Sequence, residues 1–157
     1  MRIGQGFDIH RFSTDATRPL KLGLITVPNA VGLEGHSDAD ALAHAVADAL
    51  LGAAGLGDIG EHFSDTDATW SGADSRHLLT LVVQKIHDAG FRVENVDATV
   101  VAEAPKLGSH KSDMARELSS VVGAPVSVKA TTMEGLGPIG NKEGIAALAV
   151  ALLKEQA

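Results

Sequence analysis

Apolar and polar residues along this chain alternate with two different periods. Runs of aliphatic and β-branched residues indicate strands, and apolar residues that recur about every three to four positions indicate helices. A small polar residue before such a helix and a glycine after it mark its ends. We therefore expect helices over residues 38–54, 75–89 and 109–122, and strands over residues 1–12, 20–27, 91–102, 126–130 and 145–153.

Three details of these elements can be predicted more closely. A polar turn over residues 13–19 separates the first two strands, and we expect it to close a hairpin between them. Ser37 is a suitable N-cap for the first helix, with Asp40 three residues later in the position of a capping box. Residues 145–153 are continuously apolar, which suits a helix or a buried strand, and the strand predicted at 126–130 favours a strand.

Residues 55–73 form a long segment without a regular apolar period, rich in Gly, Asp, Ser and Thr. A long loop inside a small domain is more often functional than not. No linker, internal repeat or low-complexity segment divides the sequence. The order of elements therefore predicts one α/β (α+β) domain over residues 1–157.

The composition agrees with an enzyme more than with a scaffold. The chain has 157 residues, of which 45% are hydrophobic, enough for a sizeable core. The net charge of −7 and the absence of basic runs argue against nucleic acid and anionic membranes as partners. The lack of cysteine excludes disulfides and thiolate metal sites. Because no signal pattern and no apolar stretch of ~20 residues is found, we expect a cytoplasmic protein.

Carboxylate and imidazole side chains gather near the N-terminus at spacings that suit a divalent metal. Asp8 and His10 alternate on a predicted strand, so both project from one face. His44 is predicted on the second turn of the first helix, on the same face as Asp40. A helix packed beside the strand would bring two histidines and one aspartate together with an open fourth position, as in a catalytic zinc site. Alternatively, Asp8 and His10 are half-exposed strand residues and His44 is a hydrogen-bonded helix histidine.

Three loop segments carry groups suited to a phosphorylated ligand. Residues 57–67 provide carboxylates and flexible backbone where a sugar or nucleotide can approach. Lys106 offers a cation to a phosphate from a constrained loop. Thr131 and Thr132 offer hydroxyls to a diphosphate, and Glu134 offers a carboxylate to a second, hard cation. Each pattern alone is also typical of an ordinary turn or a solvated lysine.

Seven segments form an ordered series along the chain. They are Gly-Phe-Asp-Ile-His, His-Ser-Asp-Ala-Asp with His44, Leu-Gly-Asp-Ile-Gly, Phe-Ser-Asp-Thr-Asp, Gly-Ala-Asp-Ser-Arg, Ala-Pro-Lys and Lys-Ala-Thr-Thr-Met-Glu-Gly-Leu-Gly. In order and spacing they resemble the motifs of the 2-C-methyl-D-erythritol 2,4-cyclodiphosphate synthase family. The similarity covers essentially the whole chain, and a chance match to seven ordered motifs is implausible.

The resemblance implies a metal-dependent phosphorus-oxygen lyase of non-mevalonate isoprenoid biosynthesis. In its reaction, the 2-phosphate of 4-diphosphocytidyl-2-C-methyl-D-erythritol 2-phosphate attacks the β-phosphate, closes a cyclic diphosphate and expels CMP. Alignment and charge neutralisation by a metal serve such a transfer without a protein nucleophile. The resemblance also implies a mixed sheet with helices packed on one face, and a homotrimer with active sites between neighbouring subunits.

Position by position, the resemblance implies roles for residues of this chain. The zinc ligands correspond to Asp8, His10 and His44. A second cation, Mg²⁺ or Mn²⁺, is expected between the substrate phosphates near Glu134. His36 and Thr132 correspond to residues that stabilise the transition state. The expected contacts to phosphate, methylerythritol and cytidine are Ser37, Asp58, Ile59, Gly60, Asp65, Ala102, Ala104, Pro105, Lys106, Leu107, Thr131, Thr132 and Asn141.

One stretch departs from the family pattern. Where the family usually has an aromatic residue and an arginine, this chain has Pro138 and Asn141. The change removes a cation expected to bind anions along the trimer axis, and Lys142 can replace part of its charge. Because no metal ligand is changed, we expect an active enzyme.

Two other functions fit the residues. A zinc-dependent phosphoester hydrolase would use a metal-bound water as its nucleophile, with Asp40 or His36 as general base. A non-catalytic trimeric binding protein would hold a structural metal, whose fourth position another side chain would close. No fourth ligand is evident from the spacing.

Overall fold

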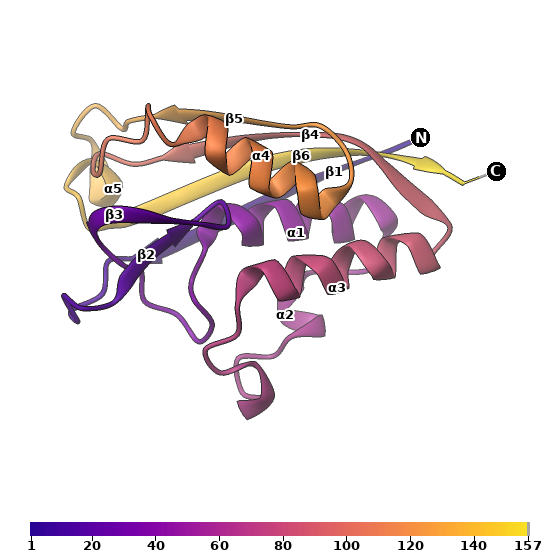
Figure 1. Cartoon of the computed structure of the whole chain (residues 1–157), viewed down its shortest axis with the longest axis horizontal. Helices are drawn as coiled ribbons and strands as arrows, with labels where there is room; N and C mark the ends of the chain where they lie inside the picture. Colours follow the sequence, from indigo (N-terminus) through magenta and orange to yellow (C-terminus); the bar gives the residue numbers. More distant parts are fainter. Residues whose placement is uncertain (157) are drawn as a thin grey trace.

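A four-stranded mixed sheet forms one layer of the molecule. In the computed structural model, which describes residues 1–156, its strand order is β1 (Arg2–Arg11), β6 (Gly144–Glu155), β4 (Phe91–Val101) and β5 (Val126–Thr131) (Figure 1). β6 pairs antiparallel with β1 and β4, whereas β4 and β5 are parallel and are joined through α4 (Lys111–Val122). The expected mixed sheet is confirmed.

The C-terminal apolar segment is a strand at the centre of this sheet, as its sequence favoured. β6 is paired along both edges, and its inward residues Ile145, Ala147, Ala149, Ala151 and Leu153 are fully buried or nearly so. Its outward residues Leu148 and Val150 remain exposed on the opposite face of the sheet.

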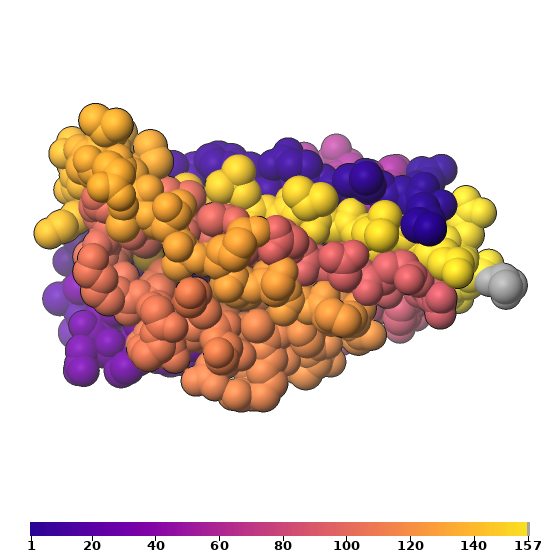
Figure 2. Space-filling model, turned by 90° about the horizontal axis from the view of Figure 1, so that it is seen from above, coloured from indigo at the N-terminus to yellow at the C-terminus, as the bar shows by residue number. Residues whose placement is uncertain are grey.

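The long helices pack on one face of the sheet, as expected. α1 (Ala41–Ala54) contacts β1, β6 and β4, and α3 (Ser75–Asp88) packs on α1. α4 contacts β5, β3 and α3. Figure 2 shows the other face, where the four strands lie side by side at the surface. Because α1 lies between the sheet and α3, nearly all of its residues are buried.

The prediction of a hairpin between the first two strands is wrong. β1 pairs with β6, whereas β2 (Pro19–Leu22) pairs with β3 (Ile25–Val31) in a separate ribbon. The reason is the turn at Gly23 and Leu24, whose φ angles of 60° and 65° are both positive. Two such residues make the tight turn that joins adjacent antiparallel strands, so the apolar run 20–27 folds back on itself.

The first helix begins three residues later than expected. Its N-cap is Asp40, whose side chain accepts the amide of Ala43, and the predicted N-cap Ser37 lies before the helix.

The segment 55–73 is more ordered than its sequence indicated, with the short helices α2 (Ile59–His62) and η1 (Ala68–Trp70). A third short helix, α5 (Gly137–Gly140), precedes β6. Within residues 1–156, no helix is both long and apolar enough to cross a membrane.

Candidate metal centre

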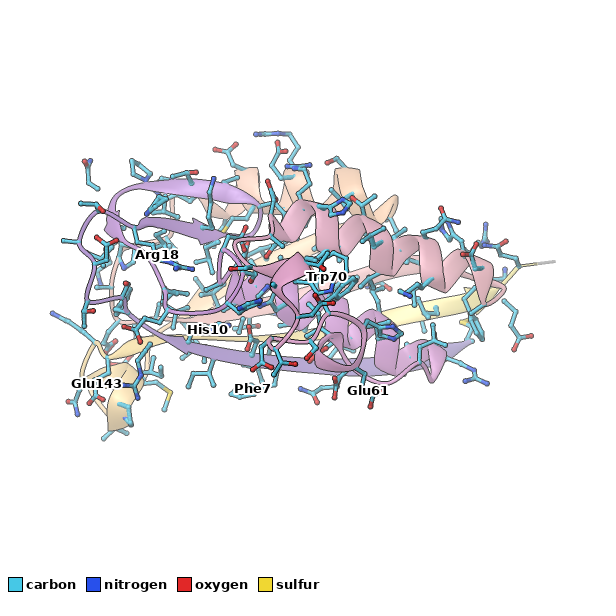
Figure 3. The ribbon with its side chains drawn as sticks, turned by 90° about the horizontal axis from the view of Figure 1, so that it is seen from below. Phe7, His10, Arg18, Glu61, Trp70 and Glu143 are labelled. Carbon is cyan, nitrogen blue, oxygen red and sulfur yellow. The ribbon has the colours of Figure 1, made fainter. Side chains whose placement is uncertain are left out.

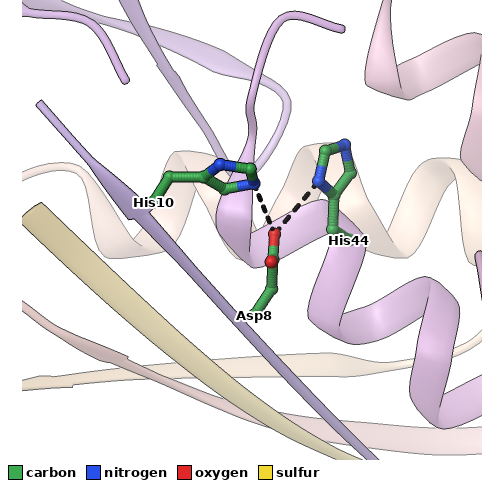
Figure 4. A group of neighbouring side chains, drawn as sticks. All are labelled: Asp8, His10 and His44. Carbon is green, nitrogen blue, oxygen red and sulfur yellow. Dashed lines mark hydrogen bonds and ion pairs between the residues drawn. The ribbon is translucent and has the colours of Figure 1, made fainter. Parts of the chain in front are cut away.

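Three side chains from two elements converge where β1 lies beside α1. Asp8 and His10 project from the same face of β1, and His44 comes from the first turn of α1 (Figure 4). Oδ2 of Asp8 lies 2.9 Å from Nε2 of His10 and 3.0 Å from Nδ1 of His44. One ligand atom from each residue lies within 4.8 Å of the other two. The group is therefore close enough to bind one metal ion, as the spacing predicted.

Two glycines of β1 permit this convergence. A Cβ atom at Gly6 would lie 1.9 Å from the carbonyl oxygen of Ala45, and one at Gly4 would lie 2.0 Å from that of Ala49. Real Cβ atoms do not approach backbone atoms so closely, so only glycine lets the strand lie directly against the helix. The short separation brings His44 within reach of Asp8.

The donor set fits a divalent metal. Nε2 of His10 is buried and makes no hydrogen bond of good geometry within the described residues, although Asp8 is at ion-pair distance. An unsatisfied buried ring nitrogen is costly unless something else occupies its lone pair. Two imidazole nitrogens and one carboxylate oxygen are a common zinc set that leaves a position for a ligand.

Charge within the group favours ionised Asp8. Burial opposes ionisation, but the contacts and charges of His10 and His44 outweigh it and lower the pKa of the Asp8 carboxyl. Burial likewise opposes the charged form of His44, yet its bond to Asp8 and the charges of Asp8 and Asp40 raise its pKa. An ionised carboxylate beside two imidazoles is the state that attracts a cation.

The other ring nitrogen of His44, Nε2, lies within hydrogen-bond distance of two serine hydroxyls. Nε2 lies 3.0 Å from Oγ of Ser75, the first residue of α3, and 3.3 Å from Oγ of Ser37. The Ser75 hydroxyl donates in turn to the carboxylate of Asp38. Metal-binding histidines are commonly oriented by such outer hydrogen bonds.

Asp40 is not part of the metal group, although it shares a helix face with His44 in the sequence. Its fully buried carboxylate accepts the amides of Gly23, Leu24 and Ala43 at 2.7–3.0 Å. Burial raises the pKa of Asp40, while these amide bonds act in the opposite direction. The side chain therefore joins the β2–β3 turn to the start of α1, and it cannot reach a metal-bound water as a general base.

A cavity of about 450 Å³ opens beside the metal group. Two of its lining residues, His10 and Trp70, are labelled in Figure 3. Eight of the predicted site residues line it: Asp8, His10, His36, Ser37, His44, Ile59, Gly60 and Asp65. His36 is exposed, and its Nε2 donates to the carbonyl oxygen of Asp67 over 3.1 Å. Asp58 lies just outside the lining as the N-cap of α2, where it accepts the amide of Glu61.

Three apolar side chains also line the cavity, and none of them is among the predicted site residues. These are Phe63, Trp70 and Leu78. Phe63 and Trp70 stack edge to face with ring centroids 4.8 Å apart. Such a surface suits a carbon skeleton more than a phosphate. Phe63 opens the Phe-Ser-Asp-Thr-Asp motif, whereas Leu78 follows the apolar period of its helix and Trp70 follows the polar segment 64–67.

Two further residues brace the cavity walls and were also missed. Arg18 donates to the carbonyl oxygen of Ser37 at 2.7 Å, which fixes the segment that carries His36. Asp48, one turn after His44 on α1, accepts the amide of Ile59 at 2.7 Å, and burial raises its pKa. The four-residue spacing from His44 was a usable signal for Asp48, whereas Arg18 acts across a fold that the sequence does not reveal.

The remaining predicted residues lie elsewhere in the chain. A separate cavity of about 180 Å³ is lined by Ala102, Pro105, Lys106, Leu107, Thr131 and Thr132, among others. Ala104 faces a third cavity together with Lys142. Glu134 accepts a hydrogen bond from Thr132 at 2.9 Å, and Asn141 is the exposed C-cap of α5. None of these residues lines the cavity at Asp8, so within the described chain the expected site residues are not gathered in one cavity.

Comparisons with known proteins agree with the motifs. The family model described as the YgbB family matches residues 1–154. A 2-C-methyl-D-erythritol 2,4-cyclodiphosphate synthase of Bordetella petrii is 56% identical over 97% of this chain and 94% of its own length. One of Desulfosudis oleivorans is 54% identical over 99% and 94%, respectively.

Solved structures show the same fold. The bifunctional IspDF of Campylobacter jejuni superposes with a TM-score of 0.93 at 43% identity, covering 98% of this chain and 42% of that longer protein. A CDP complex of IspF from Plasmodium falciparum gives a TM-score of 0.85 at 34% identity, over 99% of this chain and 97% of that one. The cyclodiphosphate synthases named above are relatives of this chain over nearly their whole length. Together with the family match over residues 1–154, they show that the chain belongs to the YgbB family.

Proposed function

We propose that this protein is a 2-C-methyl-D-erythritol 2,4-cyclodiphosphate synthase. An oxygen of the 2-phosphate of 4-diphosphocytidyl-2-C-methyl-D-erythritol 2-phosphate forms a bond to the β-phosphorus. The bond from that phosphorus to the CMP oxygen breaks, and CMP leaves with the electron pair. The observation that carries this proposal is the Asp8, His10 and His44 group beside a cavity in a chain 56% identical to a named synthase.

Asp8, His10 and His44 are the residues that would hold a zinc ion. When bound, zinc would supply a Lewis acid that neutralises charge on the β-phosphate. The residues that line the cavity would position the substrate. Ser37 and His36 line the same cavity and offer a hydroxyl and an imidazole to phosphate oxygens. Phe63 and Trp70 provide an apolar surface for the methylerythritol skeleton, and together these contacts hold the two phosphates in line.

The second group of residues would bind the nucleotide half of the substrate. The cavity at Lys106 and Thr131 combines a cation, a hydroxyl and backbone from the loop after β4, which suits cytidine and its diphosphate. Thr132 and Glu134, already hydrogen-bonded to each other, would stabilise the transferring phosphate and hold Mg²⁺ or Mn²⁺. IspF from Plasmodium falciparum is described as a CDP complex, in agreement with a cytidine site.

A homotrimer would unite the two groups. They line separate cavities in one chain, so one complete site needs the metal group of one subunit and the nucleotide loop of its neighbour. The helix-free face of the sheet exposes Ile3, Phe7, Ile9, Leu148 and Val150, an apolar surface that association would bury. We therefore assign this face to contacts between copies of the chain.

CMP release from the diphosphocytidyl substrate by zinc-loaded protein tests the proposal. His44→Ala removes one metal ligand, so it should abolish CMP release while the circular dichroism spectrum remains that of a folded protein. Lys154→Ala, an exposed change near the end of β6, should retain wild-type rates. Wild-type turnover by folded His44→Ala would overturn the metal assignment.

A further inference from the structure

A buried hydrogen-bond chain runs from His44 to Asp38, and the proposed chemistry does not use it. Nδ1 of His44 faces Asp8, and Nε2 on the other side lies 3.0 Å from Oγ of Ser75. Ser75 is only 1% exposed, and its hydroxyl donates to Oδ1 of Asp38. The backbone amide of Ser75 donates to Oδ2 of the same carboxylate over 2.9 Å. Both oxygens of Asp38 therefore accept from Ser75, and Oδ1 also accepts the backbone amide of Asp40 at 3.2 Å.

The directions of these bonds fix where the protons lie. A carboxylate only accepts hydrogen bonds, so the hydroxyl proton of Ser75 points at Asp38. Oγ of Ser75 then presents lone pairs to His44, and Nε2 of His44 must carry the proton that fills this contact. In a neutral imidazole the lone pair is then on Nδ1, the nitrogen that faces Asp8 and His10.

We propose that Ser75 and Asp38 are positioning residues that hold His44 in the tautomer and ring orientation required to bind the metal through Nδ1. This inference rests on the metal centre proposed above. Neither residue touches substrate or metal in this role. Asp38 acts through Ser75, and Ser75 acts through His44.

Ser37 does not perform the same task. Its Oγ lies farther from Nε2, at 3.3 Å, and accepts the amide of Ala39. The structure shows no carboxylate acceptor for its proton within residues 1–156. The hydroxyl can therefore donate to Nε2 or accept from it, and it does not select one tautomer.

Two substitutions separate this role from simple packing. Ser75→Ala removes the acceptor and should weaken zinc binding by about 10- to 100-fold, the usual effect of losing such an outer partner. Asp38→Asn keeps the shape but provides an amide that can donate to Oγ of Ser75. The serine proton is then released toward Nε2, which favours the wrong tautomer, so a comparable loss is expected.

The double variant gives a distinctive result. If Asp38 acts only through Ser75, Asp38→Asn should cost nothing further in a Ser75→Ala background, because the hydroxyl that it orients is gone. If Asp38 contributes only by stabilising the start of α3, its loss should add to that of Ser75→Ala, and the proposal would be overturned. Asp74→Ala is the matched control, because it removes the N-cap of α3 without a contact to His44. It should lower thermal stability and leave zinc affinity unchanged.

The experiment is a zinc titration of the full chain against a chromophoric chelator, together with ¹⁵N NMR of its histidine rings. In zinc-loaded wild-type protein we expect His44 to carry its proton on Nε2 and to bind zinc through Nδ1. The ¹⁵N NMR spectrum of the wild-type protein alone tests this expectation. A proton-free Nε2, or equal zinc affinity in Ser75→Ala and wild type, would overturn the positioning role alone. Failure of the wild-type protein to bind zinc would instead overturn the metal centre and this inference with it.

Discussion

Oδ2 of Asp8 and Nδ1 of His44 lie 3.0 Å apart although 36 residues separate them in the sequence. Asp8 is on an edge strand of the sheet and His44 is on the helix that covers it. Their contact depends on how closely β1 approaches α1. The glycines that set this distance are therefore as important to the metal group as the ligands themselves.

Gly6→Ala tests this dependence. The new Cβ would collide with backbone atoms of Ala45 and Ala49, so we expect a loss of about 3 kcal/mol in the free energy of unfolding and weaker zinc binding. Gly52→Ala is the control, because its Cβ would meet its nearest atom at an ordinary 3.8 Å. Alanine is also the better helix former there, so this variant should gain up to about 1 kcal/mol. Denaturant titration measures both, and a neutral Gly6→Ala would contradict the close-packing account.

Mixing two inactive variants tests whether the site lies between chains. His44→Ala lacks a metal ligand and Thr132→Ala lacks a hydroxyl of the second group. If one site uses His44 of one subunit and Thr132 of its neighbour, randomly reassembled equal mixtures should recover about one quarter of wild-type activity. Recovery is measured as CMP release after the mixture is dissociated and refolded. No recovery, with trimers present, would place both groups in the same subunit.

Asp40→Asn should destabilise the fold without changing the metal ligands. The aspartate accepts three backbone amides, and an asparagine would turn its NH₂ group toward at least one of them. We expect a loss of about 1–3 kcal/mol in the free energy of unfolding, the usual cost of an unmatched buried donor. Asp74→Asn, at the exposed N-cap of α3, keeps a good capping side chain and should be nearly neutral. Equal stability of the two variants would show that Asp40 is not the link described above.

The stability of the β4–β5 pair should depend on pH through Asp97. Hydrogen bonds from Lys129 and Ser127 lower the pKa of Asp97 below its ordinary 3.8. The unfolded chain therefore binds this proton more readily, so the contribution is fully present above about pH 4 and disappears as the pH falls through the folded pKa.

Thermal denaturation of wild-type protein and Asp97→Asn across that range measures this contribution. The difference in melting temperature should be present at neutral pH, narrow in acid and shrink in high salt, because the pair is exposed. A difference that persists unchanged in acid would assign the effect to packing.

The sequence predicted those features that depend on residues close together in the chain. The spacing of Asp8 and His10 on a strand and of His44 on a helix was enough to propose the metal group, because each period fixes which face a side chain occupies. Gly90 after α3 marked the end of that helix correctly. The predicted hairpin is wrong because the apolar run 20–27 has the pattern of one strand, although Gly23 within it allows the positive φ angle of a tight turn.

Long-range partners could not be found in this way. β1 pairs with β6, more than 130 residues away, and no local pattern in either strand identifies its pairing partner. Ser75 belongs to the Gly-Ala-Asp-Ser-Arg motif, but no local pattern indicated its contact with His44, 31 residues away. Helix spacing places Asp40 on the same face as His44, but the β2–β3 turn supplies amides that hold its carboxylate instead. Tertiary contacts decide such roles.

Phosphorus NMR of the product tests the central claim most directly. The wild-type protein would be incubated with 4-diphosphocytidyl-2-C-methyl-D-erythritol 2-phosphate, zinc and magnesium, and the fate of the β-phosphate followed. We predict a cyclic diphosphate that appears together with an equal amount of CMP. CMP accompanied only by a linear bisphosphate would contradict cyclisation and identify a hydrolase, and no turnover by folded, metal-loaded protein would contradict the enzymatic function itself.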